Sequence, residues 1–343
     1  MIEIDGSAGG GQILRSALTL SAITDEAVTI KSIRGDRPNP GLRPQHLTAV
    51  EVMADICDAE VEDATEGSES ITFRPEALSG GRYTASIGTA GSVTLLFDCV
   101  LPLAWALSTP LTLTATGGTD VKWSPPLGYF RHVKLPVLMD AGLVGGVVRE
   151  RTGFYPAGGG TAVLQLAPTS TTHIAAINRG ELRGARIFSR AADTLTDASV
   201  AERQADTAVD HLATDDIPIL ERTVTYEATP SPGSVLLVTL EYERTRAGFD
   251  ALGERGKPAE DVANDATDMI ETFRAGRGAV DVHLADQLLV PLAIAGGRLA
   301  IPRVTDHVET SLDLLAEFDF DIKIERSFGD SPIVSAAPAE YIV

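Results

Sequence analysis

Two stretches in the second half of the chain repeat apolar positions with the spacing of an α-helix. Residues 199–213 and 259–273 set apolar side chains three and four positions apart among charged ones, which predicts two solvated amphipathic helices. The intervening run 234–243, SVLLVTLEYE, favours a strand. The predicted order in this region is strand, helix, strand, strand, helix, which is typical of a compact α+β domain.

Acidic residues concentrate in the same part of the chain, whereas glycine and aliphatic residues dominate on both sides of it. At 343 residues the chain is too long for one small domain. We therefore expect an α/β (α+β) fold with a discontinuous main domain, residues 1–177 plus 277–343, and an inserted α+β domain at residues 178–276.

Glycine-rich turns recur along the predicted main domain and hint at an internal repeat. Several of them precede an apolar run, so they would either let backbone N–H groups approach a phosphate or form tight turns in a repeated α/β unit. Neither a P-loop motif nor a GxGxxG motif after a strand is present, so the two commonest nucleotide-binding fingerprints are absent. The turns lie at residues 6–11, 88–91, 117–118, 158–160 and 296–297.

The charge balance is strongly negative, with 28 basic and 48 acidic residues and a net charge of −20. A negative field normally counts against nucleic acid, because phosphate binding needs a basic surface. Many carboxylates with few lysines also suit a cell with molar internal salt, where the Debye length falls to about 3 Å and only local arginines matter. The composition fits either a salt-adapted protein or an acidic protein of ordinary habitat, and it does not exclude RNA.

The two cysteines, Cys57 and Cys99, exclude a disulfide framework and favour a reducing cytoplasm. We expect both to be core residues without a chemical role. The longest apolar run, 93–107, is interrupted by Asp98 and Pro102. No run reaches the roughly 18 uncharged residues that a membrane helix requires, so no membrane association is expected.

His307 has the most informative setting of the six histidines. No HExxH, CxxC or GxSxG motif occurs, which argues against a zinc enzyme and an esterase. Asp306 and Glu309 form a capping-box pattern before apolar positions at helical spacing, which places His307 at the first helical position. A helix N-terminus disfavours imidazolium, so a neutral ring there could attack a phosphorus atom. The alternative is a partly exposed surface histidine.

Two further groups of side chains are candidates for nucleotide binding. In a second predicted helix, His283, Asp286 and Gln287 share one face, where they could stack a base, hold a cation and bind a phosphate. The alternative is a solvated polar face. Near the N-terminus an arginine cluster suits bidentate phosphate recognition, unless it is ordinary surface charge. Its members are Arg15, Arg34, Arg37 and Arg43, with Gln12, Gln45 and His46 beside them.

Taken together, these segments resemble the RNA 3′-terminal phosphate cyclase family in order and spacing across nearly the whole predicted main domain. The runs GFYPAGGG and HLADQ are the most specific to that family. The region 178–276 matches mainly in position and pattern. The matching runs are DGSAGGGQILRS (5–16), IRGDRPNPGLRPQHLTA (33–49), GTAGSVTLL (88–96), GGTDVKWSPP (117–126), GFYPAGGG (153–160) and HLADQLLVPLA (283–293), with His307 ahead of a helix.

The resemblance implies a main domain of repeated βαβαββ units, similar to the enolpyruvyl-transferase architecture, with a small α/β insert. It also implies a three-step reaction on an RNA with a 3′-phosphate end. The histidine first attacks the α-phosphorus of ATP and forms adenylyl-histidine. AMP then passes to the RNA 3′-phosphate, and the neighbouring 2′-hydroxyl displaces AMP to close a 2′,3′-cyclic phosphate, helped by a large effective molarity.

The resemblance further implies roles for individual residues. His307 would be the nucleophile, with Arg15 and Arg37 in catalysis, and Asp286 would hold a divalent metal, Mg or Mn. Pro125 and His283 would pack on the two faces of the adenine, and many relatives have tyrosine in place of this histidine. ATP would contact Gln12, Asp98, Pro125, His283, Leu284, Ala285, Asp286 and Gln287, and phosphate or RNA would contact Arg34, Arg43 and Gln45.

The chain departs from the family pattern at two places. Relatives usually read DGSxGEGGGQ near the N-terminus, whereas this chain reads DGSAGGGQ and lacks the glutamate near the metal. Asp98 stands where many relatives have a glutamine that contacts ATP. Asp5 or Asp98 would be the carboxylate that replaces the missing one.

Three other functions are alternatives to RNA 3′-phosphate cyclisation. A non-catalytic RNA-binding relative in ribosome assembly lacks the nucleophilic histidine, whereas His307 is present here. An enolpyruvyl transferase does not need a histidine beside an adenine pocket. A general polynucleotide-end adenylating enzyme uses the same chemistry and stays open.

Overall fold

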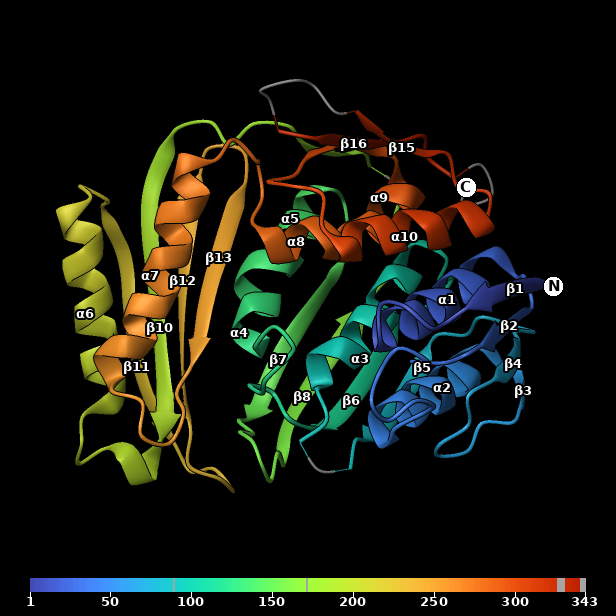
Figure 1. Ribbon diagram of the computed structural model, residues 1–343, viewed down its shortest axis with the longest axis horizontal. Helices are drawn as coiled ribbons and strands as arrows, with labels where there is room; N and C mark the ends of the chain where they lie inside the picture. Colours follow the sequence, from blue (N-terminus) through green and yellow to red (C-terminus); the bar gives the residue numbers. More distant parts are fainter. Residues whose placement is uncertain (89, 171, 326–330, 340–343) are drawn as a thin grey trace.

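The computed structural model describes residues 1–88, 90–170, 172–325 and 331–339 (Figure 1). Thr89, within the predicted turn at 88–91, lies outside the described residues. The fold is mixed α/β, as predicted. Among the described residues, no helix has the length and apolarity to cross a membrane. Below, "insert" denotes residues 178–276, and "main body" denotes the described residues on either side of it.

The main body contains three four-stranded sheets with the same strand order and direction. In each sheet the first two strands are parallel, and the last strand lies antiparallel between the second and the third. The sheets are β1 (Ile2–Asp5), β2 (Val28–Lys31), β4 (Ile71–Arg74) and β3 (Glu60–Glu62); β5 (Gly81–Ser86), β6 (Leu111–Gly117), β8 (Gly160–Leu166) and β7 (Gly145–Arg151); and β9 (Ile174–Ala176), β14 (Gly297–Ala300), β16 (Ile333–Ala336) and β15 (Ile322–Glu325).

Helices pack between these sheets around one continuous hydrophobic core. Cys57 and Cys99 are buried, unpaired members of that core, as predicted, and burial raises the pKa of both thiols, to about 12 and about 11. The helices are α1 (Gly11–Thr24), α2 (Pro44–Cys57), α3 (Val93–Val100), η1 (Leu101–Trp105), α4 (Leu127–Tyr129), η2 (Phe130–Lys134), α5 (Leu135–Asp140), α8 (Val282–Gln287), α9 (Leu289–Ala295) and α10 (Asp306–Glu317).

The insert forms a four-stranded sheet with two helices on one face and has its own apolar cluster (Figure 1, left). The predicted helices and the predicted strand are confirmed, each to within two residues at either end. The elements are β10 (Leu182–Ala192), η3 (Asp193–Leu195), α6 (Val200–Thr214), β11 (Ile219–Glu227), β12 (Ser234–Tyr242), β13 (Arg246–Leu252) and α7 (Ala259–Ala275).

The predicted element order of the insert was wrong in one respect, because it lacks strand β13. In this strand, RAGFDAL, Ala247, Phe249 and Ala251 pack in the apolar cluster of the insert, and Gly248 and Asp250 lie on the opposite face. Gly248 lies against the main body, where an added Cβ would come within 2.8 Å of the Tyr129 ring. The strand therefore alternates between the insert core and the main body, instead of between core and solvent.

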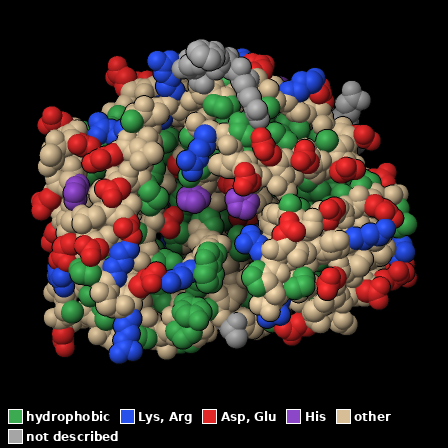
Figure 2. Space-filling model, viewed as in Figure 1, with side chains coloured by type: hydrophobic (Ala, Val, Ile, Leu, Met, Phe, Trp, Pro, Cys, Tyr) green, Lys and Arg blue, Asp and Glu red, His purple; other side chains and the backbone are tan. Residues whose placement is uncertain are grey.

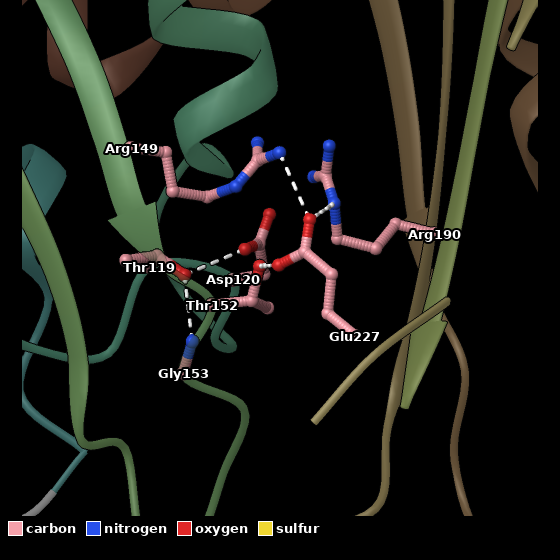
Figure 3. A network of polar contacts seen from close by, with 7 residues as sticks. All are labelled: Thr119, Asp120, Arg149, Thr152, Gly153, Arg190 and Glu227. Atoms are coloured by element: carbon pink, nitrogen blue, oxygen red, sulfur yellow. Dashed lines mark hydrogen bonds and ion pairs between the residues drawn. The ribbon is translucent and has the colours of Figure 1, made fainter. Parts of the chain in front are cut away.

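A buried polar network joins the insert to the main body (Figure 3). Arg149 of β7 and Arg190 of β10 donate to the same carboxylate oxygen of Glu227 at 3.2 and 3.1 Å, and the Thr152 hydroxyl donates to the other oxygen at 2.5 Å. Burial opposes ionisation of Glu227, but these three donors outweigh it and lower the pKa of the carboxyl. The carboxylate is thus held ionised between the two parts.

The two ends of the insert are fastened to each other by Arg179. Its Nε donates to the Gly278 carbonyl at 2.6 Å, and Nη2 donates to the Phe273 carbonyl at 2.8 Å. The guanidinium also lies 3.7 Å from the centre of the Phe273 ring. The chain therefore enters and leaves the insert at one place.

Candidate active site

A cavity of about 1270 Å³ opens between the main body and the insert. Figure 2 looks into this hollow, with histidine and basic side chains at its rim and hydrophobic side chains on its floor. The structure places Leu284 and Ala285 in the core, where each is at most 1% exposed and does not line the cavity. The other predicted site residues all line it: Gln12, Arg15, Arg34, Arg37, Arg43, Gln45, Asp98, Pro125, His283, Asp286, Gln287 and His307.

The N-terminus of α1 faces the cavity without a capping side chain among the described residues. Gly10 holds a positive φ of 61°, and a Cβ on Gly11 would lie 2.4 Å from Nε2 of His46. Only glycine therefore allows the loop to close this tightly. The N–H groups of the first helical turn and the positive end of the helix dipole favour a bound anion.

Arginines surround this helix end. Burial lowers the pKa of the Arg15 guanidinium, and the nearby Cys99 and Asp98 partly offset this lowering. Burial also lowers the pKa of Arg34, and the nearby charges of Arg43 and Arg37 lower it further. Like charges brought this close repel one another, and a bound polyphosphate would relieve that repulsion.

Arg34 has a second, structural role. Its Nη1 donates to the carbonyls of Asn39 and Gly41, at 2.8 and 2.9 Å. Its backbone φ is 56°, in the left-handed region. The side chain therefore folds the loop that carries Arg37 and Arg43 as well as facing the cavity.

His46, which the sequence grouped with the arginines, is buried beneath them at 3% exposure. Burial first, and then the charges of Arg15, Arg34 and Arg43, lower the pKa of the imidazole to about 3. Its Nδ1 accepts the backbone N–H of Arg43 at 3.1 Å. The ring is therefore neutral and supports the arginine loop.

Asp281, which sequence reasoning missed, fixes the helix that carries the HLADQ run. One oxygen of this buried carboxylate accepts the Tyr129 hydroxyl at 2.7 Å and the N–H groups of His283 and Leu284 at 3.0 and 2.9 Å. The other oxygen accepts the N–H of Gly248 in β13 at 3.0 Å. An aspartate directly before a predicted helix is an N-cap signal that could have identified it.

Asp286 and Gln287 present oxygen atoms that lack a partner. Among the described residues, neither Oδ1 of Asp286 nor Oε1 of Gln287 has a hydrogen bond, although both atoms are buried. Burial raises the pKa of Asp286 to about 6, against the opposing charges of His283 and Lys134. Buried oxygens without donors suit a hard divalent cation, whereas the described residues hold no cluster of three or more His, Cys, Asp or Glu placed to bind a metal.

Asp98 is paired with Lys134, another residue that the sequence analysis missed. Lys134 Nζ lies 2.6 Å from Asp98 Oδ1, and the lysine side chain is 3% exposed. It ends the π-helical turn η2, a type of turn that is frequent at functional sites. Asp5, the other candidate to replace the missing glutamate, accepts from Ser7 at 3.0 Å and does not line the cavity.

His307 lies exposed on the first turn of α10 and lines the cavity. The predicted cap was wrong by one residue, because the Thr305 hydroxyl, and not Asp306, accepts the N–H of Val308 at 3.2 Å. His307 is therefore the second helical residue. Gln12 Nε2 donates to the Ser311 hydroxyl at 2.9 Å, which ties this helix to α1.

Comparison with known proteins identifies the family. The profile of the family described as RNA 3′-terminal phosphate cyclase matches residues 7–325. The protein of that name from Halobacterium salinarum is 45% identical over 98% of this chain and 100% of its own. Those from Pyrococcus furiosus and Methanosarcina barkeri are 40% and 38% identical, over 93% and 96% of this chain and 93% and 98% of their own. The chain therefore belongs to the RNA 3′-terminal phosphate cyclase family.

Proposed function

We propose that this enzyme cyclises RNA 3′-phosphate ends at the cavity described above, with His307 as the nucleophile. The observation that carries the proposal is that the exposed imidazole, the α1 N-terminus with its arginines, and the polar face of α8 all line one cavity. In the first step an imidazole nitrogen forms a bond to the α-phosphorus of ATP, and pyrophosphate leaves. An RNA 3′-phosphate oxygen then displaces the histidine, and the 2′-hydroxyl finally displaces AMP.

The chain's own residues would bind and orient the phosphates in these steps. The uncapped N-terminus of α1 and the forks of Arg15 and Arg37 supply N–H donors and positive charge where negative charge gathers on phosphate oxygens. Pro125 and His283 line the same cavity and would enclose the adenine. Asp98, held by Lys134, would face the nucleotide as half of an ion pair.

A divalent metal, Mg or Mn, fits the oxygens of Asp286 and Gln287, which are buried without a donor from the part of the chain that the structure describes. When bound there with ATP, it would neutralise charge on the phosphates. Burial raises the pKa of Asp286, but only to about 6, so most of this carboxylate would still be ionised and able to bind a cation at pH 7.

We further propose that the main body is a threefold βαβαββ repeat, similar to the enolpyruvyl-transferase architecture, and that residues 178–276 form an inserted domain. The shared strand order of the three sheets and the separate apolar cluster of the insert support both proposals. A cytoplasmic location stays a prediction from the two unpaired cysteines.

Labelling with ATP that carries ³²P at the α-phosphate tests the assignment. We expect wild-type protein to retain an acid-labile, base-stable label, and His307→Ala and His307→Asn to retain none while folding normally, because the side chain is exposed. His173→Asn, whose ring contacts the Ala295 carbonyl outside this cavity, is the matched control and should label fully.

The products separate the remaining alternatives. A 3′-phosphorylated oligonucleotide should end as a 2′,3′-cyclic phosphate. An RNA that stops at the adenylated end would indicate a general end-adenylating enzyme. Label retained by the His307 variants would place the nucleophile elsewhere, and absence of label from wild-type protein would indicate an RNA-binding relative without catalysis.

A further inference from the structure

Trp123 is the most exposed large hydrophobic side chain among the described residues, at 92%. It lies in the cavity wall, two residues before Pro125. The other tryptophan of the chain, Trp105, is 4% exposed in the main core. The core accounts for Trp105, whereas no packing contact accounts for an indole left in water at the mouth of an active site.

The backbone around Trp123 holds the indole in this exposed position. Its φ of 62° lies in the left-handed region, which is costly for a bulky side chain. The neighbouring residues are anchored on both sides: Lys122 Nζ pairs with Glu254 of the insert at 2.9 Å, and the Pro125 carbonyl accepts the Thr94 hydroxyl at 2.8 Å. The ring is therefore presented from a fixed loop and does not hang from a free one.

An exposed aromatic ring beside a cluster of arginines is the arrangement by which proteins bind single-stranded nucleic acid. Bases stack on the ring while the cations bind the backbone phosphates. Here Arg34, Arg37 and Arg43 line the same cavity as Trp123. Stacking has little dependence on base identity, since every base offers a π-face, and it adds affinity that the negative net charge of −20 cannot provide.

We propose that Trp123 is a stacking platform for a nucleobase within the last two nucleotides of the RNA 3′ end. The inference rests on the proposed function, which places the 3′-phosphate in this cavity. Pro125 and His283 are assigned to the adenine of ATP, so the indole of Trp123 is left for the second nucleic-acid ligand. The subsite would grip the RNA end without reading its sequence.

Steady-state kinetics test the proposal with Trp123→Ala and Trp123→Phe. Loss of one stacked base should raise the KM for a 3′-phosphorylated oligonucleotide roughly 5- to 150-fold in Trp123→Ala. Trp123→Phe, which keeps a ring, should retain most of the affinity. Labelling of His307 by ATP alone should proceed at the wild-type rate in both variants, since that step needs no RNA.

An oligonucleotide that lacks the last two bases but keeps the sugars and the 3′-phosphate completes the test. It should bind wild-type protein as weakly as the normal RNA binds Trp123→Ala, and the substitution should add no further loss. RNA should also quench the fluorescence of Trp123, with buried Trp105 as a constant background.

Three results would overturn the proposal. An unchanged KM in Trp123→Ala would show that the ring does not contact RNA. Additive effects of the substitution and the missing bases would show that it contacts something other than those bases. A loss of ATP labelling as large as the loss of RNA affinity would place Trp123 in the adenine pocket. Failure of the proposed function itself is distinct, because wild-type protein would then retain no label.

Discussion

The two walls of the active-site cavity carry opposite charge. The main-body wall brings Arg15, Arg34, Arg37 and Arg43 around the N-terminus of α1. The insert wall is formed by β13, the first ten residues of α7 and the loop between them, and presents Asp250, Glu254, Asp265 and Asp268, with Lys257 among them. In a chain of net charge −20, the arginines that line the cavity all lie on the main-body side, and the insert side has a net excess of carboxylates.

This difference indicates how anionic ligands are oriented. Under the proposed function, phosphates would be drawn to the main-body wall, where N–H donors and guanidinium forks are in place, and would be repelled from the insert wall. The carboxylates of the insert wall would therefore disfavour phosphate binding on that side of the cavity. Asp281 of the main body links Gly248 of β13 to the N-terminus of α8, and Lys122 pairs with Glu254 of the insert.

The largest effect should follow from removing charge on the main-body wall. Arg15→Ala should lower the rate of cyclisation about ten- to a hundred-fold, because losing hydrogen bonds to a charged group costs about 1.5–3 kcal/mol. Arg15→Lys should restore only part of it, since an ammonium lacks the planar fork. The measurement is kcat/KM for end-cyclisation.

Lys257→Ala removes a cation from the opposite wall and is the matched control. Lys257 already contacts Asp265, so its loss should leave the rate within about two-fold of wild type, as expected for an exposed ion pair. Equal losses in Arg15→Ala and Lys257→Ala would remove the distinction between the two walls.

Added salt should affect the two walls differently, with a smaller effect on activity than the loss of Arg15. If the carboxylates are a salt adaptation, stability and activity should both rise with KCl toward molar concentration, because repulsion among the carboxylates is screened. Counterion release normally weakens RNA binding as salt rises. We expect only a shallow decline here, because few arginines contact the RNA.

Circular dichroism and cyclisation, followed together during a KCl titration, measure both trends. The control is Arg37→Ala, in which the salt dependence of folding should be unchanged. A protein that is fully folded and most active at low salt would contradict the adaptation.

The smallest effect should come from the insert wall. Burial, and then the charges of Asp281 and Asp120, raise the pKa of Asp250 to about 7. Between about pH 4 and 7 the unfolded chain has released this proton while the folded chain keeps it, so stability falls as the pH rises through that window. Asp250→Asn should make the fall smaller, leaving the part due to Asp286, whose pKa is also raised, and should stabilise the protein above pH 7 by on the order of 1–2 kcal/mol, allowing for partial solvent screening.

Urea unfolding at pH 5 and pH 8 measures this change. Asp268→Asn, an exposed carboxylate on the same wall, should leave the difference between the two pH values as in wild type. A wild-type protein whose stability is the same at both values would show that Asp250 is not held protonated.

The sequence predicted those parts of the molecule that local pattern controls. Helices α6 and α7 follow from periodicity, because each has one face toward the core and another toward solvent. Strand β12 follows from its run of aliphatic and β-branched residues, most of which are buried on both faces. The pattern failed at β13, whose two faces both meet protein. The family resemblance, in contrast, treated HLADQ as one group of ATP contacts, although the helical period directs Leu284 and Ala285 into the core, away from Asp286.

For the site, the residues that a motif carries could be predicted, whereas those brought in by tertiary contact could not. Lys134 lies 36 positions from its partner Asp98, and nothing in either segment indicates that pair. Asp250 belongs to the insert and reaches the cavity only because β13 packs against the main body. Trp123 stood within a recognised motif, but its exposure could be seen only in the structure.

The clamp made by Arg179 has a consequence for how such a chain can arise. Arg179, at the start of the insert, is hydrogen-bonded to Gly278 and Phe273 at its end. The first and last residues of the insert therefore lie next to each other. A segment of this kind can be gained or exchanged in a gene without rerouting the chain on either side, much as a loop can be lengthened. The covering wall can therefore diversify from one lineage to another while the phosphate-binding wall is inherited intact.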